Sequence, residues 1–317
     1  MHSNQFGFTP KKSTTDAIMA AKTAITEGMS AGDVIVLASL DIKGAFDAAW
    51  WPSILNGLRA YKCPNNLFKL VRNYFTQRSA YLSTNNHRFQ KEVSRGCSQG
   101  SMCGPGLWNI QYNSILNLNF TERTTAIAFA DDLLLITRGK SVREAENFAN
   151  IDMSKINLWS RRNKIEFNEA KSKTMLISRR KRKEAKEIKI FLNNTPIEQV
   201  KTMKYLGVII DDKFKFSQHI SYVADKCAKL IFSLSKSAKI HWGLKHEALT
   251  TIYNGAILPL LLYGAPVWID ALKYEFNRRK YNRVQKTNES SDRQGISHYV
   301  KRSVMHTSWN HTDRNQS

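Results

Sequence analysis

Two adjacent aspartates, Asp131 and Asp132, are the residues of this chain best suited to do chemistry. Apolar residues flank them on both sides, at 126–129 and at 133–136. Neighbouring carboxylates repel each other, but a hard divalent cation such as Mg²⁺ binds carboxylate oxygens and turns that repulsion into attraction. The apolar flanks predict two strands joined by a tight turn, with the acids at its tip. The pattern therefore indicates a metal site for phosphoryl transfer.

A third aspartate, Asp41, follows an apolar run at 34–40 that is typical of a strand buried on both faces. If this strand lies beside the hairpin that carries Asp131 and Asp132, three carboxylates meet at one edge of a sheet. Such a group can hold two metal ions about 3.5–4 Å apart, which bind the attacking and leaving oxygens of an in-line displacement. A single aspartate after a strand is more often a turn or helix cap, so the hypothesis depends on all three together.

The composition points to a basic protein with a substantial core. The chain has 317 residues, of which 42% are hydrophobic, enough for two or three subdomains. Its formal net charge of +22 opposes compaction unless a polyanion binds, and nucleic acid is the natural partner. No signal peptide opens the chain and no apolar stretch approaches the roughly 18–20 residues of a membrane span, so no membrane partner is expected.

The cysteines show no spacing of a metal site. We expect free thiols in a reducing compartment and no disulfide-linked partner. The four residues concerned are Cys63, Cys97, Cys103 and Cys227.

The elements that must position the acids can be read from periodicity and turn residues. A loop precedes a helix from about Ile18 to Met29, and a turn at 32–33 leads into the strand that ends at Asp41. Pro52 marks the first turn of the next helix. Between 64 and 94 the pattern predicts a helix and then a hairpin.

The second half of the chain is predicted to be mainly helical. A helix follows the glycine-rich loop at 95–106, and Ser141 with Glu144 fits a capping box that opens a long helix to about Asn163. Two short strands come next, then a helical stretch that Pro259 and Pro266 interrupt, and last a polar tail for which little order is expected. These segments lie at 174–177, 205–210, 217–271 and 287–317.

Five short motifs stand in the order and spacing of a known family. Together they resemble the reverse transcriptase of non-LTR (LINE-type, jockey-like) retrotransposons, over roughly residues 4–286. Any one of them is weak evidence, but five in order are specific. They lie at 5–8, 40–47, 95–101, 129–132 and 204–207.

The resemblance implies an α+β fold, the right-hand polymerase with an antiparallel-sheet palm, partial fingers and a helical thumb. The family's upstream fingers and endonuclease would be missing and the polar tail would replace its usual helices, as in a copy truncated at both ends. The implied parts are partial fingers at 1–32, a palm at 33–212 with a fingers-like insertion at about 64–94, a helical thumb and connection at 213–286, and the polar tail at 287–317.

The resemblance also implies the catalytic group. Asp41, Asp131 and Asp132 would hold two Mg²⁺ ions, with Mn²⁺ as a substitute and the Ile42 carbonyl as a further ligand. These ions would lower the pKa of a primer 3′-hydroxyl and neutralise charge on the triphosphate.

Other positions match residues that contact the nucleotide. Phe46, five residues after Asp41, matches the sugar gate that favours dNTPs; the alternative is a core phenylalanine that anchors the next helix. Gln99 and Gly100 match residues beside the incoming nucleotide and template, where glycine permits close approach and glutamine adds no charge; the alternative is a polar loop before a helix. Ser98 stands where the family usually has proline.

Basic and aromatic positions complete the implied site. Lys171 matches the lysine that protonates the leaving pyrophosphate, with a plain phosphate contact as the alternative and Lys173 as a competitor. Tyr205 and Gly207 match the primer grip, or else an ordinary core strand. Lys12 is the best match to a fingers cation that contacts the triphosphate.

The implied partners are template RNA, a DNA primer and dNTPs. The basic run at 179–183 would track a phosphate backbone or act as a nuclear import signal, although a solvated turn is the default. The expected location is intracellular, in the nucleus, with the cytoplasm as the alternative. Two other functions stay open: an inactive remnant that only binds nucleic acid, and a basic binding module that needs no acidic triad.

Overall fold

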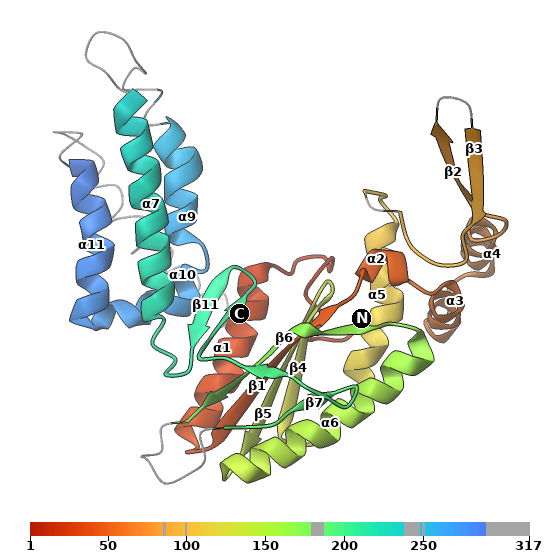
Figure 1. The fold of residues 1–317 in the computed structure, drawn as a ribbon, viewed down its shortest axis with the longest axis horizontal. Coiled ribbons are helices and arrows are strands. Elements are labelled where there is room, and N and C mark those ends of the chain that lie inside the picture. The colour runs from red at the N-terminus through yellow and green to blue at the C-terminus, as the bar shows by residue number, and fades with distance from the viewer. Residues whose placement is uncertain (85–86, 99, 179–186, 238–247, 249–250, 290–317) are drawn as a thin grey trace. The chain divides into compact units, whose positions relative to one another are not determined.

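The computed structural model describes residues 1–84, 87–98, 100–178, 187–237, 248 and 251–289. The chain divides into two compact units, Met1–Lys201 and Thr202–Ser317, and each is described by itself. The first unit combines helices with a mainly antiparallel sheet, as expected for the α+β class (Figure 1). The functional boundaries expected at 32, 212 and 286 stay predictions, because compactness alone does not define them.

A five-stranded sheet forms the centre of the first unit, with the order β4-β5-β1-β6-β9. The central strand β1 pairs antiparallel with β5 on one side and β6 on the other. Residues 34–38 are at most 1% exposed, so the predicted strand that is buried on both faces is confirmed. The strands are β1 (Val34–Ile42), β4 (Thr124–Phe129), β5 (Asp132–Gly139), β6 (Phe167–Ile177) and β9 (Glu198–Gln199).

Helices cover both faces of this sheet (Figure 1). Val36 and Ala38 belong to a core cluster that also contains residues of α5 (Gly104–Tyr112) and α6 (Val142–Asn163). Ile35 and Leu37 alternate with them and therefore point to the opposite face. There the helix α1 (Thr14–Ser30) packs, and its predicted apolar positions, among them Ile18 and Ile25, are buried.

The two long helices begin at side-chain caps. Ser13 and Asp16 form a reciprocal capping box at the start of α1. At α6, Ser141 accepts a hydrogen bond from the Glu144 amide at 3.2 Å, as predicted. The Glu144 carboxylate, however, accepts from the backbone amide of Lys140, so the predicted box at Ser141 is only half formed.

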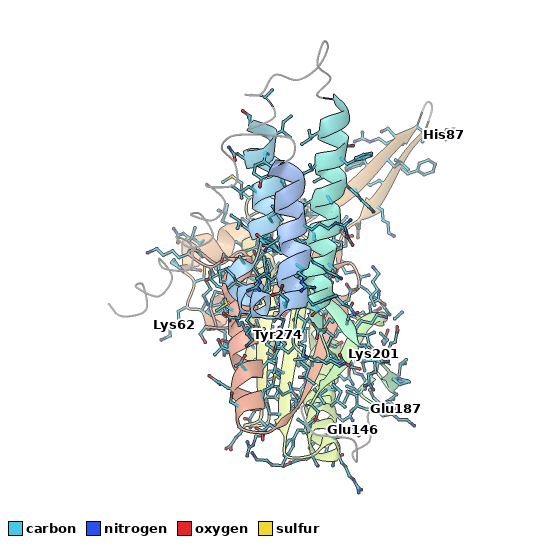
Figure 2. The ribbon with its side chains drawn as sticks, turned by 90° about the vertical axis from the view of Figure 1, so that its left-hand side faces the viewer. Lys62, His87, Glu146, Glu187, Lys201 and Tyr274 are labelled. Carbon is cyan, nitrogen blue, oxygen red and sulfur yellow. The ribbon has the colours of Figure 1, made fainter. Side chains whose placement is uncertain are left out.

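The segment between 64 and 94 contains the expected helix and hairpin, α4 (Asn65–Tyr74), β2 (Ser79–Thr84) and β3 (His87–Glu92). No residue of α4 is buried, and every residue of the two strands except Ser79 is exposed. The hairpin projects into solvent, with His87 near its far end (Figure 2). Its aromatic side chains are therefore available to a partner.

Shorter elements connect these parts of the first unit. Pro52 stands in the first turn of its helix, as predicted. The helix expected after the glycine-rich loop is α5, which tightens into a 3-10 turn, η1. The remaining bounds are α2 (Ala45–Ala48), α3 (Trp51–Ala60), η1 (Asn113–Asn117), β7 (Phe191–Leu192) and β8 (Thr195–Pro196).

The second unit opens with a hairpin rather than the single strand predicted at 205–210. Leu206 and Gly207 both have positive φ, 44° and 87°, which is the backbone of a two-residue hairpin turn. Pro266 stands in the first turn of a new helix after the left-handed Gly264, so the predicted interruption there is confirmed. At Pro259 the chain stays helical and only changes from a π-helix to an α-helix, so no interruption occurs there. The bounds are β10 (Thr202–Tyr205), β11 (Val208–Asp211), α7 (Ser217–Ser237), η2 (Tyr253–Ile257), α9 (Leu258–Leu262), α10 (Ala265–Trp268), η3 (Ile269–Lys273) and α11 (Glu275–Glu289).

Among the described residues one stretch, Tyr253–Lys273, is long and apolar enough to cross a membrane by length and composition, so the statement that no stretch approaches that length was wrong. This is weak evidence for a membrane span, because core helices pass the same test. The four cysteines are free, as predicted. The basic run at 179–183 and the tail from 290 lie outside the described residues.

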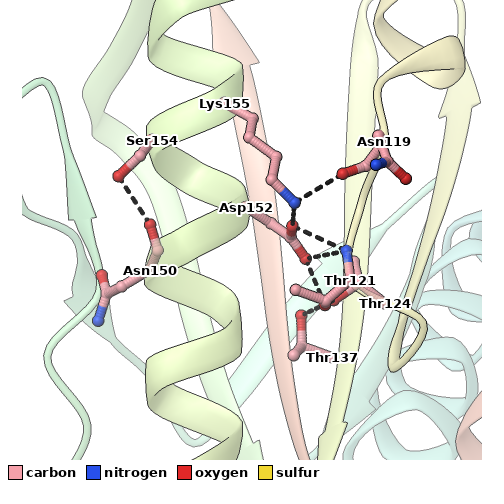
Figure 3. Close-up of polar contacts among 8 residues, drawn as sticks. All are labelled: Asn119, Thr121, Thr124, Thr137, Asn150, Asp152, Ser154 and Lys155. Atoms are coloured by element: carbon pink, nitrogen blue, oxygen red, sulfur yellow. Dashed lines mark hydrogen bonds and ion pairs between the residues drawn. The ribbon is translucent and has the colours of Figure 1, made fainter.

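A buried polar network fastens α6 to the loop that precedes β4 (Figure 3). The Asp152 carboxylate is fully buried and accepts hydrogen bonds from the Thr121 amide at 3.0 Å and the Thr121 hydroxyl at 2.7 Å. Lys155 donates to the same carboxylate at 2.9 Å and to the Asn119 carbonyl at 2.6 Å. The network fixes the start of β4 and hence the hairpin that carries the acids.

We expect Asp152→Ala to lower the free energy of unfolding by about 3 kcal/mol, because it leaves a buried backbone amide, a hydroxyl and an ammonium without their shared acceptor. Urea unfolding followed by circular dichroism measures the change. Glu187→Ala, at an exposed position, is the control and should have little effect. Equal losses in the two variants would contradict the assignment of this network.

Candidate active site

The predicted hairpin places the acids at its tip. Phe129 pairs with Asp132, so Ala130 and Asp131 form a two-residue turn between β4 and β5. Ala130 has a φ of 55°, a left-handed conformation that costs a residue other than glycine about 1–2 kcal/mol. Two-residue hairpin turns use positive φ because it matches the twist of the strands. The acidic turn (residues 130–132) is therefore well defined but strained.

The register of the sheet brings Asp41 to the same edge. Leu40 of β1 is opposite Leu133 of β5, so Asp41 lies one residue further along, toward Asp132. On its other side Asp41 pairs with Asn168 of β6. The convergence predicted from the sequence is thus present in the pairing of the strands.

The charges of the three acids act on one another. The pKa of Asp132 is raised from 3.8 to about 6, first by burial and then by the negative charges of Asp131 and Asp41. The three carboxylates therefore interact as one group, in which mutual repulsion favours the binding of a positive charge.

The chemistry of this group fits a hard divalent ion. Its side-chain donors are the carboxylates of Asp41, Asp131 and Asp132, and oxygen donors of this kind suit Mg²⁺ or Mn²⁺. Within the described ranges, however, no three His, Cys, Asp or Glu side chains are already arranged around one metal position. A bound ion would have to draw the carboxylates together against their repulsion. Ile42 ends β1 opposite Phe167, and its role as a carbonyl ligand stays a prediction.

A bulge in β6 supports the backbone of Asp41. The pairing of β1 with β6 shifts register between Ser39 and Asp41, which leaves residues 169–172 without regular partners on β1. Within this bulge the Ser172 hydroxyl donates to the Asn168 carbonyl at 2.7 Å and accepts from the Asp41 amide at 3.1 Å. This irregularity was not predicted from the residue pattern.

The two candidate lysines in this strand differ in their surroundings. Lys173 forms an ion pair with Glu198 and also donates to the Ala170 carbonyl at 3.1 Å. Lys171 is exposed on the bulge, and its ammonium makes no hydrogen bond or ion pair with the described residues. The structure therefore leaves Lys171 more available than Lys173 for an added ligand.

Phe46 lies between two aromatic rings next to the acidic turn. Its ring centroid is 6.1 Å from that of Phe8 and 6.0 Å from that of Trp108. Phe46 is partly buried against the core, which agrees with both proposed roles, the gate and the helix anchor. Trp108 also donates from its indole nitrogen to the Ala130 carbonyl at 3.1 Å, a contact that sequence reasoning missed.

Three further site predictions fall near the N-terminal segment and the glycine-rich loop. Gln99 lies outside the described residues. Gly100 has a φ of 79° and open space around it, so its backbone conformation explains the glycine. The Lys12 ammonium contacts the carbonyls of Ser3 and Gln5 and thus holds the N-terminal segment. Its expected contact with a triphosphate stays a prediction.

Tyr205 and Gly207 belong to the second unit, and only their contacts within that unit are described. Tyr205 is 2% exposed, at the end of β10. Gly207 occupies the turn, where an added Cβ would lie 2.8 Å from the Tyr263 ring. The Tyr263 hydroxyl donates to the Leu206 carbonyl at 2.7 Å, which fixes this turn. A role in gripping a primer stays a prediction for both residues.

Comparison with known proteins identifies sequence relatives. The profile of a family described as reverse transcriptase (RNA-dependent DNA polymerase) matches residues 1–210. A 115 kDa protein of the type-1 retrotransposable element R1DM of Drosophila melanogaster is 29% identical over 282 residues, which are 89% of this chain and 27% of that protein. The R1 Pol polyprotein of Bradysia coprophila is 28% identical over 89% of this chain and 28% of its own length.

A further sequence relative and a solved structure are also similar to this chain. The RNA-directed DNA polymerase of the mobile element jockey of Drosophila melanogaster is 26% identical over 86% of this chain and 30% of its own length. The chain thus spans less than a third of these relatives. A solved structure, apo telomerase from Candida tropicalis, superposes with a TM-score of 0.47 at 11% identity, over 94% of this chain and 57% of that chain. This likeness is too low to carry an argument.

Replacement of Asp132 by asparagine is expected to stabilise the metal-free protein at pH 7.5 but not at pH 4. Because the folded-state pKa lies near 6 and the ordinary value is 3.8, folding favours the protonated acid, and stability falls as pH rises through that window. Asparagine removes this loss. We expect a gain of about 1–2 kcal/mol at pH 7.5, after allowance for screening by solvent.

Urea unfolding in EDTA at the two pH values measures this difference. The control is Glu122→Gln, the same change of chemistry at an exposed acid of the same unit. A destabilisation at pH 7.5, or the same effect at both pH values, would show that the three acids do not repel one another as described.

Proposed function

The chain belongs to the reverse transcriptase (RNA-dependent DNA polymerase) family, and on that premise we propose that it is an RNA-directed DNA polymerase of a retrotransposon. The reaction would add a nucleotide from a dNTP to the 3′-hydroxyl of a DNA primer on an RNA template. One observation carries the proposal. Asp41, Asp131 and Asp132 converge at one edge of a buried sheet, where the charges of Asp41 and Asp131 raise the pKa of Asp132.

The three aspartates would bind the divalent ions that the family uses. When bound, two Mg²⁺ ions supply activation of the 3′-hydroxyl and neutralisation of the triphosphate. The chain's own contribution is position: β1 and the hairpin present the carboxylates from rigid backbone, so little reorganisation is needed when charge develops. Mn²⁺ would serve as a substitute because it accepts the same oxygen ligands.

Lys171 is proposed to donate the proton that the leaving group needs. The 3′-hydroxyl loses its proton to solvent as its oxygen forms a bond to the α-phosphorus, the bond to the bridging oxygen breaks, and pyrophosphate leaves with the electron pair. A proton from the Lys171 ammonium to that oxygen would balance the new charge. Its exposed position on the bulge beside Asp41, without a described partner, supports this role over Lys173.

Phe46 is proposed to select the sugar. Its ring is held between Phe8 and Trp108, and Trp108 contacts the acidic turn, so the ring lies beside the catalytic group and is only partly buried. A rigid aromatic ring at this point would collide with a ribose 2′-hydroxyl. The same packing anchors the ring in the core, so the two roles are compatible.

The exposed hairpin supports nucleic acid as the partner. Tyr81 and Phe89 are 52% and 59% exposed, and the Arg88 guanidinium lies 4.3 Å from the centre of the Tyr81 ring. Aromatic rings beside cations form a stacking surface for the bases and phosphates of a single strand. A two-stranded hairpin is only marginally stable alone, so a partner on this surface would also stabilise it. Template RNA is the proposed partner.

A second candidate function is nucleic-acid binding without polymerase activity. Within the described residues no three metal-binding side chains are already arranged around an ion, which favours a basic nucleic-acid binder. The two functions differ in their need for the acids. A binder predicts salt-dependent affinity that is indifferent to Mg²⁺ and to removal of Asp131.

Primer extension separates these functions. With poly(rA)/oligo(dT), dTTP and Mg²⁺, we expect the protein to extend the primer and Asp131→Ala to lose about 100-fold or more of that rate, because a charged ligand is removed from the site. Glu122→Ala, at an exposed acid, should retain the rate. If the parent protein extends no better than Asp131→Ala, the polymerase proposal fails and the binder remains.

Phe46→Val tests the sugar gate. We expect the ratio of rNTP to dNTP incorporation to rise about 10-fold or more, because a smaller side chain admits the 2′-hydroxyl. Single-nucleotide incorporation measures the ratio. Phe75→Val is the matched control, since Phe75 is buried and stacks on Trp51. Unchanged selectivity in a folded Phe46→Val protein would leave only the anchoring role.

A further inference from the structure

The acidic turn needs support from outside its own hairpin. Ala130 holds a strained left-handed conformation, and the neighbouring carboxylates repel one another. Two hydrogen bonds from α5 reach the turn, from Trp108 to the Ala130 carbonyl at 3.1 Å and from the Tyr112 hydroxyl to the Asp131 carbonyl at 3.3 Å. These bonds hold one side of the turn. The other side lies against the N-terminal segment.

Residues 4–7, which we call the clamp segment, run along β4 like a short extra strand. The Phe6 amide donates to the Ala128 carbonyl at 2.9 Å, and the Ala128 amide donates to the Asn4 carbonyl at 3.0 Å. The Asn4 side chain adds a third bond, to the Ala126 carbonyl at 3.0 Å. The segment is therefore in register with the strand that leads directly into the acidic turn.

Gly7 lies so close to the turn that no side chain fits. A Cβ at this position would be 2.0 Å from the Ala130 nitrogen and 2.8 Å from both the Ala130 Cα and the Phe129 carbonyl carbon. All three atoms belong to the backbone, which cannot move aside as a flexible side chain does. Any residue larger than glycine must therefore displace either the clamp segment or the acidic turn.

A buried pair of amides fixes the clamp segment to α5. Gln5 and Asn109 are at most 1% exposed, and the Gln5 amide donates to the Asn109 side-chain oxygen at 2.7 Å. Asn109 in turn donates to the Gly7 carbonyl at 2.8 Å. The same helix that holds the turn through Trp108 thus also holds Gly7 against it.

We propose that Gly7, Gln5 and Asn109 are positioning residues that set the backbone of Ala130 and hence the direction of Asp131 and Asp132. This inference deepens the proposed polymerase function, on which its catalytic meaning rests. The three residues touch no reacting atom. They act by closing the acidic turn between the clamp segment and α5.

The test compares two glycines at which a side chain would meet backbone. Gly7→Ala should displace the acidic turn, whereas Gly139→Ala, at the other end of β5, would bring a Cβ to 2.5 Å from the Ala145 nitrogen and affect only the packing of α6. Both variants should lose stability. Hydrogen exchange, read by mass spectrometry, should become at least 10-fold faster at residues 128–134 in Gly7→Ala and stay unchanged there in Gly139→Ala. Equal exchange of these residues in both variants would overturn the proposal.

Metal binding and kinetics give the second measurement. In folded Gly7→Ala we expect the Kd for Mg²⁺, measured by calorimetry, to rise at least 10-fold and kcat of primer extension to fall, with KM for the primer within about two-fold. Gly139→Ala should keep both constants. A Gly7→Ala protein with faster exchange of the acidic turn but unchanged Mg²⁺ binding would refute the positioning role.

A milder variant covers the case in which Gly7→Ala does not fold. Gln5→Met keeps the volume of the side chain but removes the donor to Asn109. We expect faster exchange of the acidic turn and a three-fold or greater rise in the Mg²⁺ Kd. A folded Gln5→Met protein that matches the parent in both would overturn the proposal. If the clamp variants alter exchange but the parent shows no Mg²⁺-dependent extension, the polymerase function fails and the clamp remains.

Discussion

The first unit must hold three mutually repelling carboxylates close together. Asp41, Asp131 and Asp132 meet at one sheet edge, and the pKa of Asp132 shows that they interact in a partly desolvated place. The covalent chain and the packing beneath it must therefore hold the group together. In a metal site of this kind the repulsion between carboxylates destabilises the folded protein, and a bound cation relieves that repulsion.

Several features of the fold provide that hold. The strand that ends at Asp41 is buried on both faces, the β6 bulge ties its backbone through Ser172, and the acidic turn is gripped from two sides. Aromatic rings continue the support into α6, through Trp108, Tyr112 and Trp159. Rigid support matters for chemistry because preorganised charges need not move when the transition state forms.

Much of this arrangement could be predicted from the sequence because it rests on local patterns. The apolar run before Asp41, the paired acids between apolar flanks and the cap at Ser141 each report a nearby structure, and all three elements are present. Failures came where a distant contact decides the outcome. Leu206 gives no sign of a turn, yet it adopts positive φ, and the Tyr263 hydroxyl bonds its carbonyl.

The same limit explains what sequence reasoning missed at the site. Nothing near Trp108 reveals that its indole reaches the Ala130 carbonyl, 22 residues away. Gly7 belongs to a recognisable motif, but only the approach of the Ala130 backbone shows why glycine is needed there. The helix α4 has an apolar pattern typical of burial, although the structure buries none of its residues completely. Contacts between distant segments are set by the whole fold rather than by local spacing.

If Asp41 and the Asp131–Asp132 pair share one cation site, an iron ion bound there should cut the backbone beside all three residues. Fe²⁺ in place of Mg²⁺, with ascorbate and peroxide, generates radicals that cut the chain within a few ångströms of the ion. A shared site predicts two cleavage positions, near residue 41 and near residues 131–132, both suppressed by excess Mg²⁺ and both lost in Asp131→Ala. Cleavage at only one of these positions, or at neither, would contradict it.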